Sequence, residues 1–133
     1  FGLVGGTTTF NGQPIKTRAC STLADAWMYS TNPAMFQGSA ERTFKSLSGC
    51  VKHALFGTDC IGFALLAPGY TDIICEADMK PWDYMALIPI VEGAGGVITD
   101  WHGDPLTLTS DGTVLAAGDP RVDALAIDAL VAV

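Results

Sequence analysis

The most regular hydrophobic pattern in the chain predicts a helix beyond its midpoint. The apolar positions that repeat at the helical spacing i, i+3, i+4 and i+7 are Leu87, Ile90, Val91 and Ala94. Pro81 and Asp83 favour a helix start, and the pair Gly95-Gly96 favours a helix end. Pro89 lies inside this segment, where it removes one backbone hydrogen bond and should kink the helix. We therefore expect a helix with one buried face that begins near an aspartate.

Shorter apolar runs predict strands that alternate with helices. Strands are expected at residues 1–6, 15–18, 27–31, 54–56, 70–76, 97–101, 106–108 and 114–117. Further helices are expected at residues 39–50, 60–67 and from about 120 onward. This alternation predicts an α/β layered fold, with a largely parallel mixed sheet, flanking helices and a single domain over residues 1–133. Asn11-Gly12 predicts a hairpin between the first two strands, which would make the sheet mixed.

The composition narrows the class of protein. Hydrophobic residues make up 49% of the chain and charged residues 16%, which excludes disorder. The formal net charge is −7 and the seven Lys and Arg residues are scattered, so no nucleic-acid partner is expected. No apolar run reaches the length of a membrane helix, so no membrane partner is expected and the predicted location is cytoplasmic. Because the chain begins with Phe1, we expect it to be part of a longer polypeptide.

Cysteine and histidine show no metal-binding pattern. The four cysteines form no CxxC motif, lie in or beside apolar segments, and are interpreted as reduced core thiols; they are Cys20, Cys50, Cys60 and Cys75. His53 and His102 have no partner motif, and structural or surface roles are expected for both. Trp82 is interpreted as a packing residue beside Asp83.

Candidate chemistry gathers at three predicted strand-to-helix junctions. In α/β sheets, ligands bind beyond the carboxyl ends of the strands. Gly57-Thr58-Asp59 leads into a helix, Glu76 ends a strand, and Asp83 lies at the start of the patterned helix. Local sequence alone favours an ordinary helix N-cap role for Thr58 or Asp59, and it fits Asp83 equally well as a cap of a core helix.

The segment from Trp82-Asp83 to Ala94-Gly95-Gly96 resembles the second signature of the inositol monophosphatase-like, metal-dependent phosphatases. Eleven residues separate Asp83 from Gly95, as in that family. The resemblance implies that Asp83 is a catalytic residue and a ligand of Mg²⁺. It also implies substrate binding by Gly57-Thr58-Asp59, whose Gly57 lies 26 residues before Asp83, and by Glu76, which lies seven residues before it.

Departures from the inositol phosphatase pattern favour one branch of the family. Asp59 stands where those enzymes have a small residue, and Gly93 stands where they have Glu. Both features resemble the histidinol-phosphate phosphatase branch, and an extra carboxylate suits a substrate that carries an ammonium and an imidazole. The resemblance covers only the C-terminal half of the family's fold. The other half's Asp-Pro-x-Asp-Gly-Thr motif is absent, since residues 119–123 are interpreted as a turn and a helix start.

The resemblance therefore implies Mg²⁺-dependent hydrolysis of a small phosphorylated substrate, with histidinol phosphate converted to histidinol in histidine biosynthesis. An inositol 1-phosphatase or related sugar phosphatase is the alternative within the enzyme class. A non-catalytic structural or interaction domain is the alternative for the isolated chain, which is expected to be inactive. The expected partner is the N-terminal half of the same protein, which would supply further Mg²⁺ ligands. The oligomeric state stays open, a homodimer included.

Overall fold

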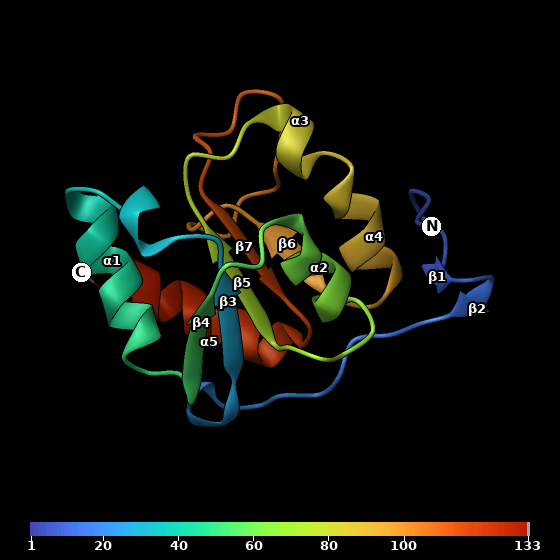
Figure 1. Cartoon of the computed structure of the whole chain (residues 1–133), viewed down its shortest axis with the longest axis horizontal. Coiled ribbons are helices and arrows are strands. Elements are labelled where there is room, and N and C mark those ends of the chain that lie inside the picture. Colours follow the sequence, from blue (N-terminus) through green and yellow to red (C-terminus); the bar gives the residue numbers. More distant parts are fainter. Residues whose placement is uncertain (133) are drawn as a thin grey trace.

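The computed structural model describes residues 1–132 (Figure 1). Its α-helices are α1 (Ser39–Ser48), α2 (Cys60–Leu66), α3 (Pro81–Tyr84), α4 (Leu87–Gly93) and α5 (Pro120–Val131), with short 3-10 helices η1 (Leu23–Asp25) and η2 (Pro33–Met35). Its strands are β1 (Thr9–Phe10), β2 (Gln13–Pro14), β3 (Trp27–Ser30), β4 (His53–Phe56), β5 (Ile73–Glu76), β6 (Val97–Thr99) and β7 (Val114–Ala117). The α/β alternation predicted from the apolar runs is confirmed.

A five-stranded mixed sheet with the order β4-β3-β5-β7-β6 forms the centre of the fold. The pairs β3·β4 and β3·β5 are parallel, whereas β7 runs antiparallel to both β5 and β6. Four of the five strands therefore run in one direction. The predicted reason for a mixed sheet was wrong: β1 and β2 form a separate two-stranded sheet, and β7 is the strand that runs against the others.

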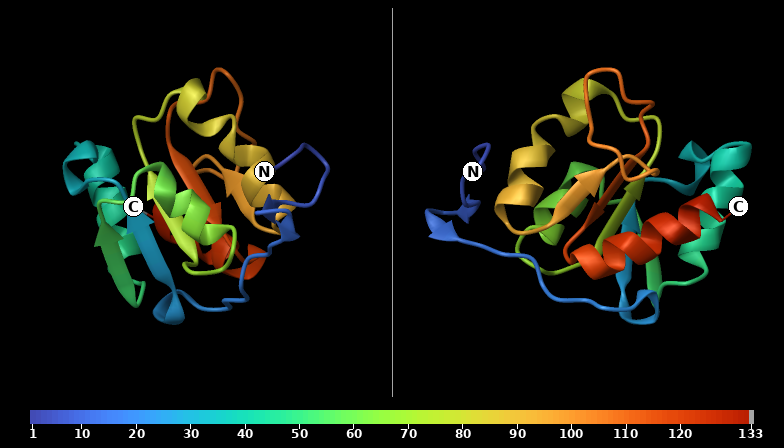
Figure 2. Two further views of the ribbon diagram at one scale, coloured as in Figure 1. Left: turned by 45° about the vertical axis from the view of Figure 1, so that its right-hand side comes forward. Right: turned by 180° about the vertical axis from the view of Figure 1, so that it is seen from behind.

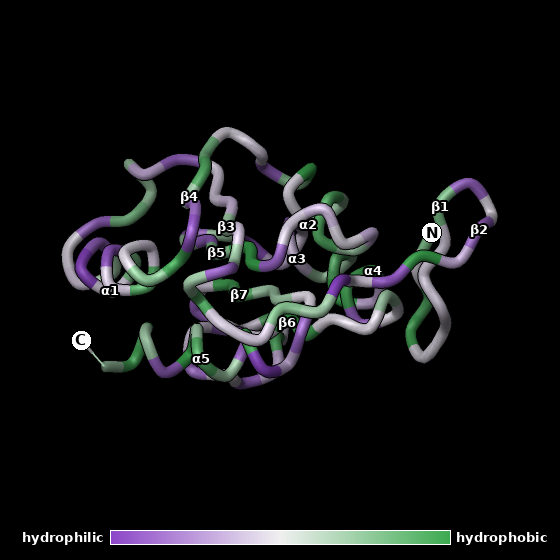
Figure 3. Tube along the Cα trace, turned by 90° about the horizontal axis from the view of Figure 1, so that it is seen from below, coloured by the Kyte–Doolittle hydropathy of each residue, from purple (hydrophilic) through white to green (hydrophobic). Residues whose placement is uncertain are grey.

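Helices cover both faces of the sheet, with α1 and α5 on one side and α2, α3 and α4 on the other (Figure 2). Strand alternation produces this division, because successive side chains point to opposite faces. Ile73 and Leu115 contribute to the core on the α1/α5 side, whereas Ile74 and Val114 contribute to the core on the α2/α4 side. Along α5 the hydropathy changes repeatedly, as expected of a helix with one face on the sheet (Figure 3). None of the helices in residues 1–132 has the length and apolar character needed to cross a membrane.

The first eighteen residues lie beside the sheet rather than in it (Figures 1 and 2). The predicted strand at residues 1–6 was wrong: Gly5 has a φ of 73° and the Gly6 N–H donates to the Leu3 carbonyl, so the segment turns. The hairpin at Asn11-Gly12 is confirmed, with φ positive at both residues. The predicted strands at 15–18 and 106–108 were also wrong, because both segments run without strand pairing.

The patterned helix is divided in two. Residues 85 and 86 form a turn between α3 and α4. Pro89 explains the position of this break, because it lacks the N–H that would bond to the Met85 carbonyl four residues earlier. The expected irregularity of the helix is thus confirmed, but it is a full break rather than a kink. The later Asp119-Pro120 segment is a turn and helix start as predicted, with Asp119 capping α5 by accepting from the Arg121 N–H.

One ion pair ties the N-terminal segment to the sheet. Asp72, which is 2% exposed, accepts from Arg18 Nε at 2.7 Å, from Arg18 Nη2 at 2.6 Å, and from the Trp27 backbone N–H at 2.8 Å. We expect Arg18→Met to lower the free energy of unfolding by about 1–3 kcal/mol, because the buried carboxylate loses its charged partner.

The side chain of Arg18 is 42% exposed, so solvent keeps this effect below that of a fully buried pair. Urea denaturation at pH 7 measures the change, with Arg42→Met on the exposed surface of α1 as the control. Equal stability of the two variants would contradict a structural role for the Arg18–Asp72 pair.

Candidate active site

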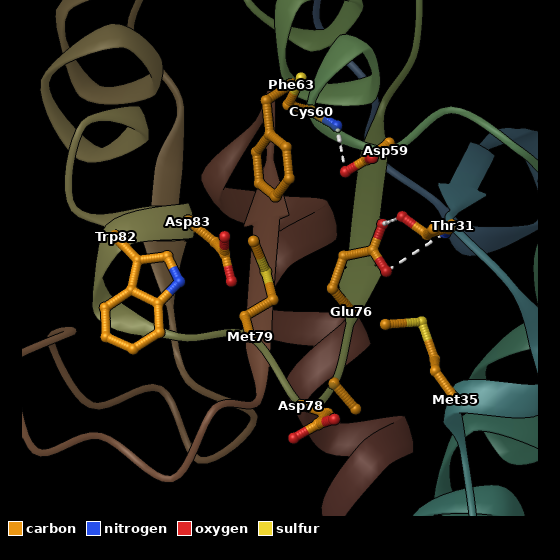
Figure 4. A pocket seen from close by; sticks show the side chains of 11 residues that line it. Thr31, Met35, Asp59, Cys60, Phe63, Glu76, Asp78, Met79, Trp82 and Asp83 are labelled. Atoms are coloured by element: carbon orange, nitrogen blue, oxygen red, sulfur yellow. Dashed lines mark hydrogen bonds between the residues drawn. The ribbon is translucent and has the colours of Figure 1, made fainter.

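A pocket of about 390 Å³ lies beyond the carboxyl ends of β3, β4 and β5 (Figure 4). It contains three of the five predicted site residues, namely Asp59, Glu76 and Asp83; Gly57 and Thr58 do not line it. The other side chains labelled in Figure 4 are Thr31, Met35, Cys60, Phe63, Asp78, Met79 and Trp82. The parallel strands explain this gathering, since their carboxyl ends meet at one edge of the sheet. The roles of the five predicted residues stay predictions.

Glu76 is the buried acid of the pocket. It ends β5 and is 2% exposed. Thr31 holds both of its carboxylate oxygens: the Thr31 hydroxyl donates to Oε1 at 2.9 Å and the Thr31 backbone N–H donates to Oε2 at 3.2 Å. Burial raises the pKa of Glu76 to about 7, while the two Thr31 hydrogen bonds oppose that rise and the nearby charge of Asp59 adds to it. The carboxyl group is therefore poised to change charge near neutral pH.

Asp59 and its neighbours form the entry to α2. Asp59 is exposed, has a φ of 50°, and caps α2 by accepting from the Cys60 N–H at 2.9 Å. Gly57 has a φ of 96°, a conformation that suits glycine. The Thr58 hydroxyl is buried without a hydrogen-bond partner among residues 1–132. It lies against Gly62, where an added Cβ would stand 2.8 Å from the Thr58 Oγ1. Asp59 therefore combines the cap role with a place in the pocket.

Asp83 lies opposite Glu76 and Asp59, at the start of α3. Its Oδ2 accepts from the Lys80 backbone N–H at 2.8 Å, and the structure shows no partner within residues 1–132 for its Oδ1. An exposed carboxylate oxygen is a suitable Mg²⁺ ligand. The described residues contain no group of three or more metal-ligating side chains placed to hold an ion. Asp83 therefore presents at the pocket one carboxylate oxygen that is free within residues 1–132, and its predicted role as a Mg²⁺ ligand stays a prediction.

Two minor predictions need correction. Trp82 was expected to pack, but it is 82% exposed at the rim of the pocket. The four cysteines are unpaired, yet only Cys20 and Cys75 are buried, whereas Cys50 and Cys60 are exposed. Both errors have the same origin, because an apolar neighbourhood in sequence does not decide which way a loop or helix-start residue faces.

Thr31 is the site residue that sequence reasoning missed. It directly follows β3, and the only sequence signal was its position at the end of the predicted strand 27–31. Its contact with Glu76 joins residues 45 positions apart, and it depends on β3 lying next to β5. Structural or surface roles were predicted for His53 and His102, and both side chains are exposed.

The chain matches the sequence profile of the "Inositol monophosphatase family" over residues 1–133. This chain belongs to the inositol monophosphatase family. The resemblance expected from the Trp82-Asp83 segment is thereby confirmed at the level of the family. The family assignment agrees with a mixed α/β sheet whose acidic pocket lies at its carboxyl edge.

Two of the similar proteins match nearly all of this chain, and a third matches less than half of it. The chloroplastic bifunctional phosphatase IMPL2 of Arabidopsis thaliana is 39% identical over 136 residues, covering 97% of this chain and 39% of that protein. A histidinol-phosphatase of Chlorobaculum parvum is 41% identical over 58 residues, covering 44% of this chain and 22% of that protein. The structure of an inositol monophosphatase from Zymomonas mobilis has a TM-score of 0.94 and 39% identity, covering 97% of this chain and 51% of that one. The chain thus spans about half the length of that solved relative, and less of the two curated ones.

The buried carboxyl group of Glu76 should make the stability of this chain depend on pH. Between about pH 4.5 and 7 the folded chain holds a proton at Glu76 that the unfolded chain has lost, so stability falls as the pH rises. With a pKa of about 7 for Glu76, the free energy of unfolding falls by at most about 3 kcal/mol across that pH range. We therefore compare the free energy of unfolding of Glu76→Gln with that of wild type. The difference, variant minus wild type, should be larger at pH 8 than at pH 5.

Urea midpoints at the two pH values measure this difference. Burial also raises the pKa of Asp123, to about 6, but Asp123 is present in both proteins and its contribution cancels. Glu92→Gln, at an exposed position of α4, is the control and should keep the wild-type pH dependence. Equal pH slopes for wild type and Glu76→Gln would show that Glu76 titrates normally.

Proposed function

We propose that the protein containing this chain is a Mg²⁺-dependent phosphate monoesterase and that its substrate is histidinol phosphate. The observation that carries this proposal is the charge of the pocket: Asp59, Glu76, Asp78 and Asp83 line it, and no Lys, Arg or His does so among the described residues. A pocket of this charge favours a substrate whose organic part is a cation. The similarity to the bifunctional phosphatase IMPL2 supports a phosphatase, and the shorter match to a histidinol-phosphatase, over 58 residues, supports this substrate.

In this proposal the two sides of the pocket have different tasks. Asp83 would supply one oxygen ligand to Mg²⁺, with the remaining ligands coming from outside this chain. The ion, when bound, would offset the negative charge of the phosphate and of the departing alkoxide. Glu76 and Asp59 lie across the pocket, where their carboxylates would accept hydrogen bonds from the ammonium and imidazole groups of histidinol. Gly57 and Thr58 would shape the substrate-facing turn without lining the pocket.

Inositol phosphate is the second candidate substrate. The pKa of Glu76 favours it, because a carboxyl group that is partly protonated near pH 7 both donates to and accepts from a neutral hydroxyl. The Zymomonas mobilis structure, an inositol monophosphatase with 39% identity, also supports this alternative.

The deciding experiment compares kcat/KM of the full-length protein for histidinol phosphate and inositol 1-phosphate at equal Mg²⁺, with a chelator control. We expect turnover that needs Mg²⁺ and favours histidinol phosphate. A preference for inositol 1-phosphate would replace the substrate assignment, and no turnover of either ester would refute the proposal as a whole.

The 133-residue chain by itself should not bind Mg²⁺ tightly. One carboxylate ligand competes poorly with the hydration shell of the ion, and the described residues offer no cluster of three ligands. Calorimetric titration of the isolated chain with Mg²⁺ should therefore show no saturable site below millimolar concentration. A micromolar site would mean that this chain holds the metal without its partner half, and it would remove the main argument that the isolated chain is inactive.

A further inference from the structure

Glu76 is a buried carboxylate with no basic partner. It is 2% exposed, and none of the ion pairs in residues 1–132 includes it. A buried charge of this kind is unfavourable unless hydrogen bonds or an opposite charge stabilise it. Thr31 provides the only hydrogen bonds that the described residues make to this side chain, one to each oxygen.

Thr31 is held in place by the sheet itself. The parallel register pairs Tyr29 with Ile74, and its continuation by two residues brings Thr31 beside Glu76. On the other side of Thr31, the Gly57 N–H donates to the Thr31 carbonyl at 2.9 Å. The backbone donor of Thr31 is therefore fixed by the main chain, and only its hydroxyl depends on the side chain.

The other titratable groups that line the pocket with Glu76 are acidic or neutral. Asp59 and Cys60 come from the start of α2, Asp78 from the loop after β5, and Asp83 from α3. Lys80 is the nearest cation in sequence, but its ammonium pairs with Asp78 and it does not line the pocket. Any positive charge that completes the environment of Glu76 within this pocket must therefore come from the ligand or from outside the chain.

We propose that Thr31 is a positioning residue that determines specificity. Thr31 donates one hydrogen bond to each Glu76 oxygen and so fixes the orientation of the carboxylate. The remaining lone pairs then point toward the pocket, where they accept hydrogen bonds from the ammonium or imidazolium of a cationic substrate. The substrate's positive charge then completes the stabilisation that Thr31 begins. This inference deepens the proposed function and rests on it for the class of substrate.

The test uses Thr31→Val and Thr31→Ser in the full-length protein. Valine keeps the shape of threonine and the backbone donor but removes the hydroxyl, whereas serine keeps the hydroxyl. We expect Thr31→Val to raise KM for histidinol phosphate roughly tenfold or more, with kcat changed less than about threefold, and Thr31→Ser to stay near wild type. Inositol 1-phosphate should show a smaller change in KM. Thr22→Val, which removes an exposed threonine–aspartate hydrogen bond far from the pocket, is the matched control.

A second measurement does not need a substrate. In NMR spectra of carboxyl-labelled protein, the Glu76 signal should titrate at a higher pH in Thr31→Val than in wild type, and at the wild-type pH in Thr31→Ser, because the hydroxyl donates to the charged form. If wild type fails to hydrolyse histidinol phosphate, the proposed function fails, and the titration still decides whether Thr31 controls Glu76. Unchanged KM and titration in Thr31→Val, or a serine variant that behaves like valine, would overturn the inference.

Discussion

Asp83→Asn in the full-length protein should lower kcat/KM for the phosphate ester at least about 100-fold, with the free energy of unfolding almost unchanged. The loss follows from charge, because a neutral amide is a much weaker Mg²⁺ ligand than a carboxylate. The preserved stability follows from geometry. Asp83 is exposed, and the one hydrogen bond that its side chain makes within residues 1–132 is accepted from the Lys80 N–H through Oδ2, which the side-chain oxygen of asparagine also accepts.

Steady-state kinetics over a range of Mg²⁺ concentrations, together with urea denaturation, separate these two effects. Asp100→Asn is a matched control, since the Asp100 carboxylate also accepts backbone N–H groups but lies outside the pocket. Asp100→Asn should keep wild-type kinetics. Comparable turnover of Asp83→Asn at equal Mg²⁺ would reduce Asp83 to a helix cap, and a large loss of stability would show that its charge is needed for folding.

Asp59→Asn should change the choice of substrate. A hydrogen bond to a charged group contributes about 1.5–3 kcal/mol, so its loss should lower kcat/KM for histidinol phosphate about 10- to 150-fold. Inositol 1-phosphate should be spared, because a neutral ring gains little from the carboxylate charge. Asparagine is the right replacement here, because Asp59 has a φ of 50° and caps α2. Asparagine tolerates that backbone conformation and keeps the cap, whereas alanine would lose both.

The measurement is the ratio of kcat/KM for the two esters in wild type and variant. Asp128→Asn, on the exposed side of α5, removes one negative charge far from the pocket and controls for net charge. A parallel fall for both esters would make Asp59 a structural or catalytic residue. A wild type that already prefers inositol 1-phosphate would remove the reason for a cation-binding role.

Local physics made much of the fold predictable from the chain alone. Apolar spacing located α1, α2, α5 and the five strands of the central sheet to within a few residues, because a helix or strand that buries one face must repeat its apolar residues with the matching period. Pro89 predicted a break in the patterned helix, because proline has no N–H to donate to the carbonyl of the residue four positions earlier. Asn11-Gly12 predicted the hairpin for an equally local reason, because both residues readily adopt the positive φ that the turn requires.

The tertiary structure alone decided the strand order, the direction of β7 and the environment of the site. Residues 1–6 are apolar enough for a strand, but they turn and find no partner in the sheet. Asp83, Glu76 and Asp59 were predicted to lie together from their places at strand-to-helix junctions and from the resemblance to the family, and all three line the pocket. The Thr31 contact, the burial that raises the pKa of Glu76, and the exposure of Trp82 depend on which segments lie side by side. Such contacts join residues far apart in sequence, and no local pattern records them.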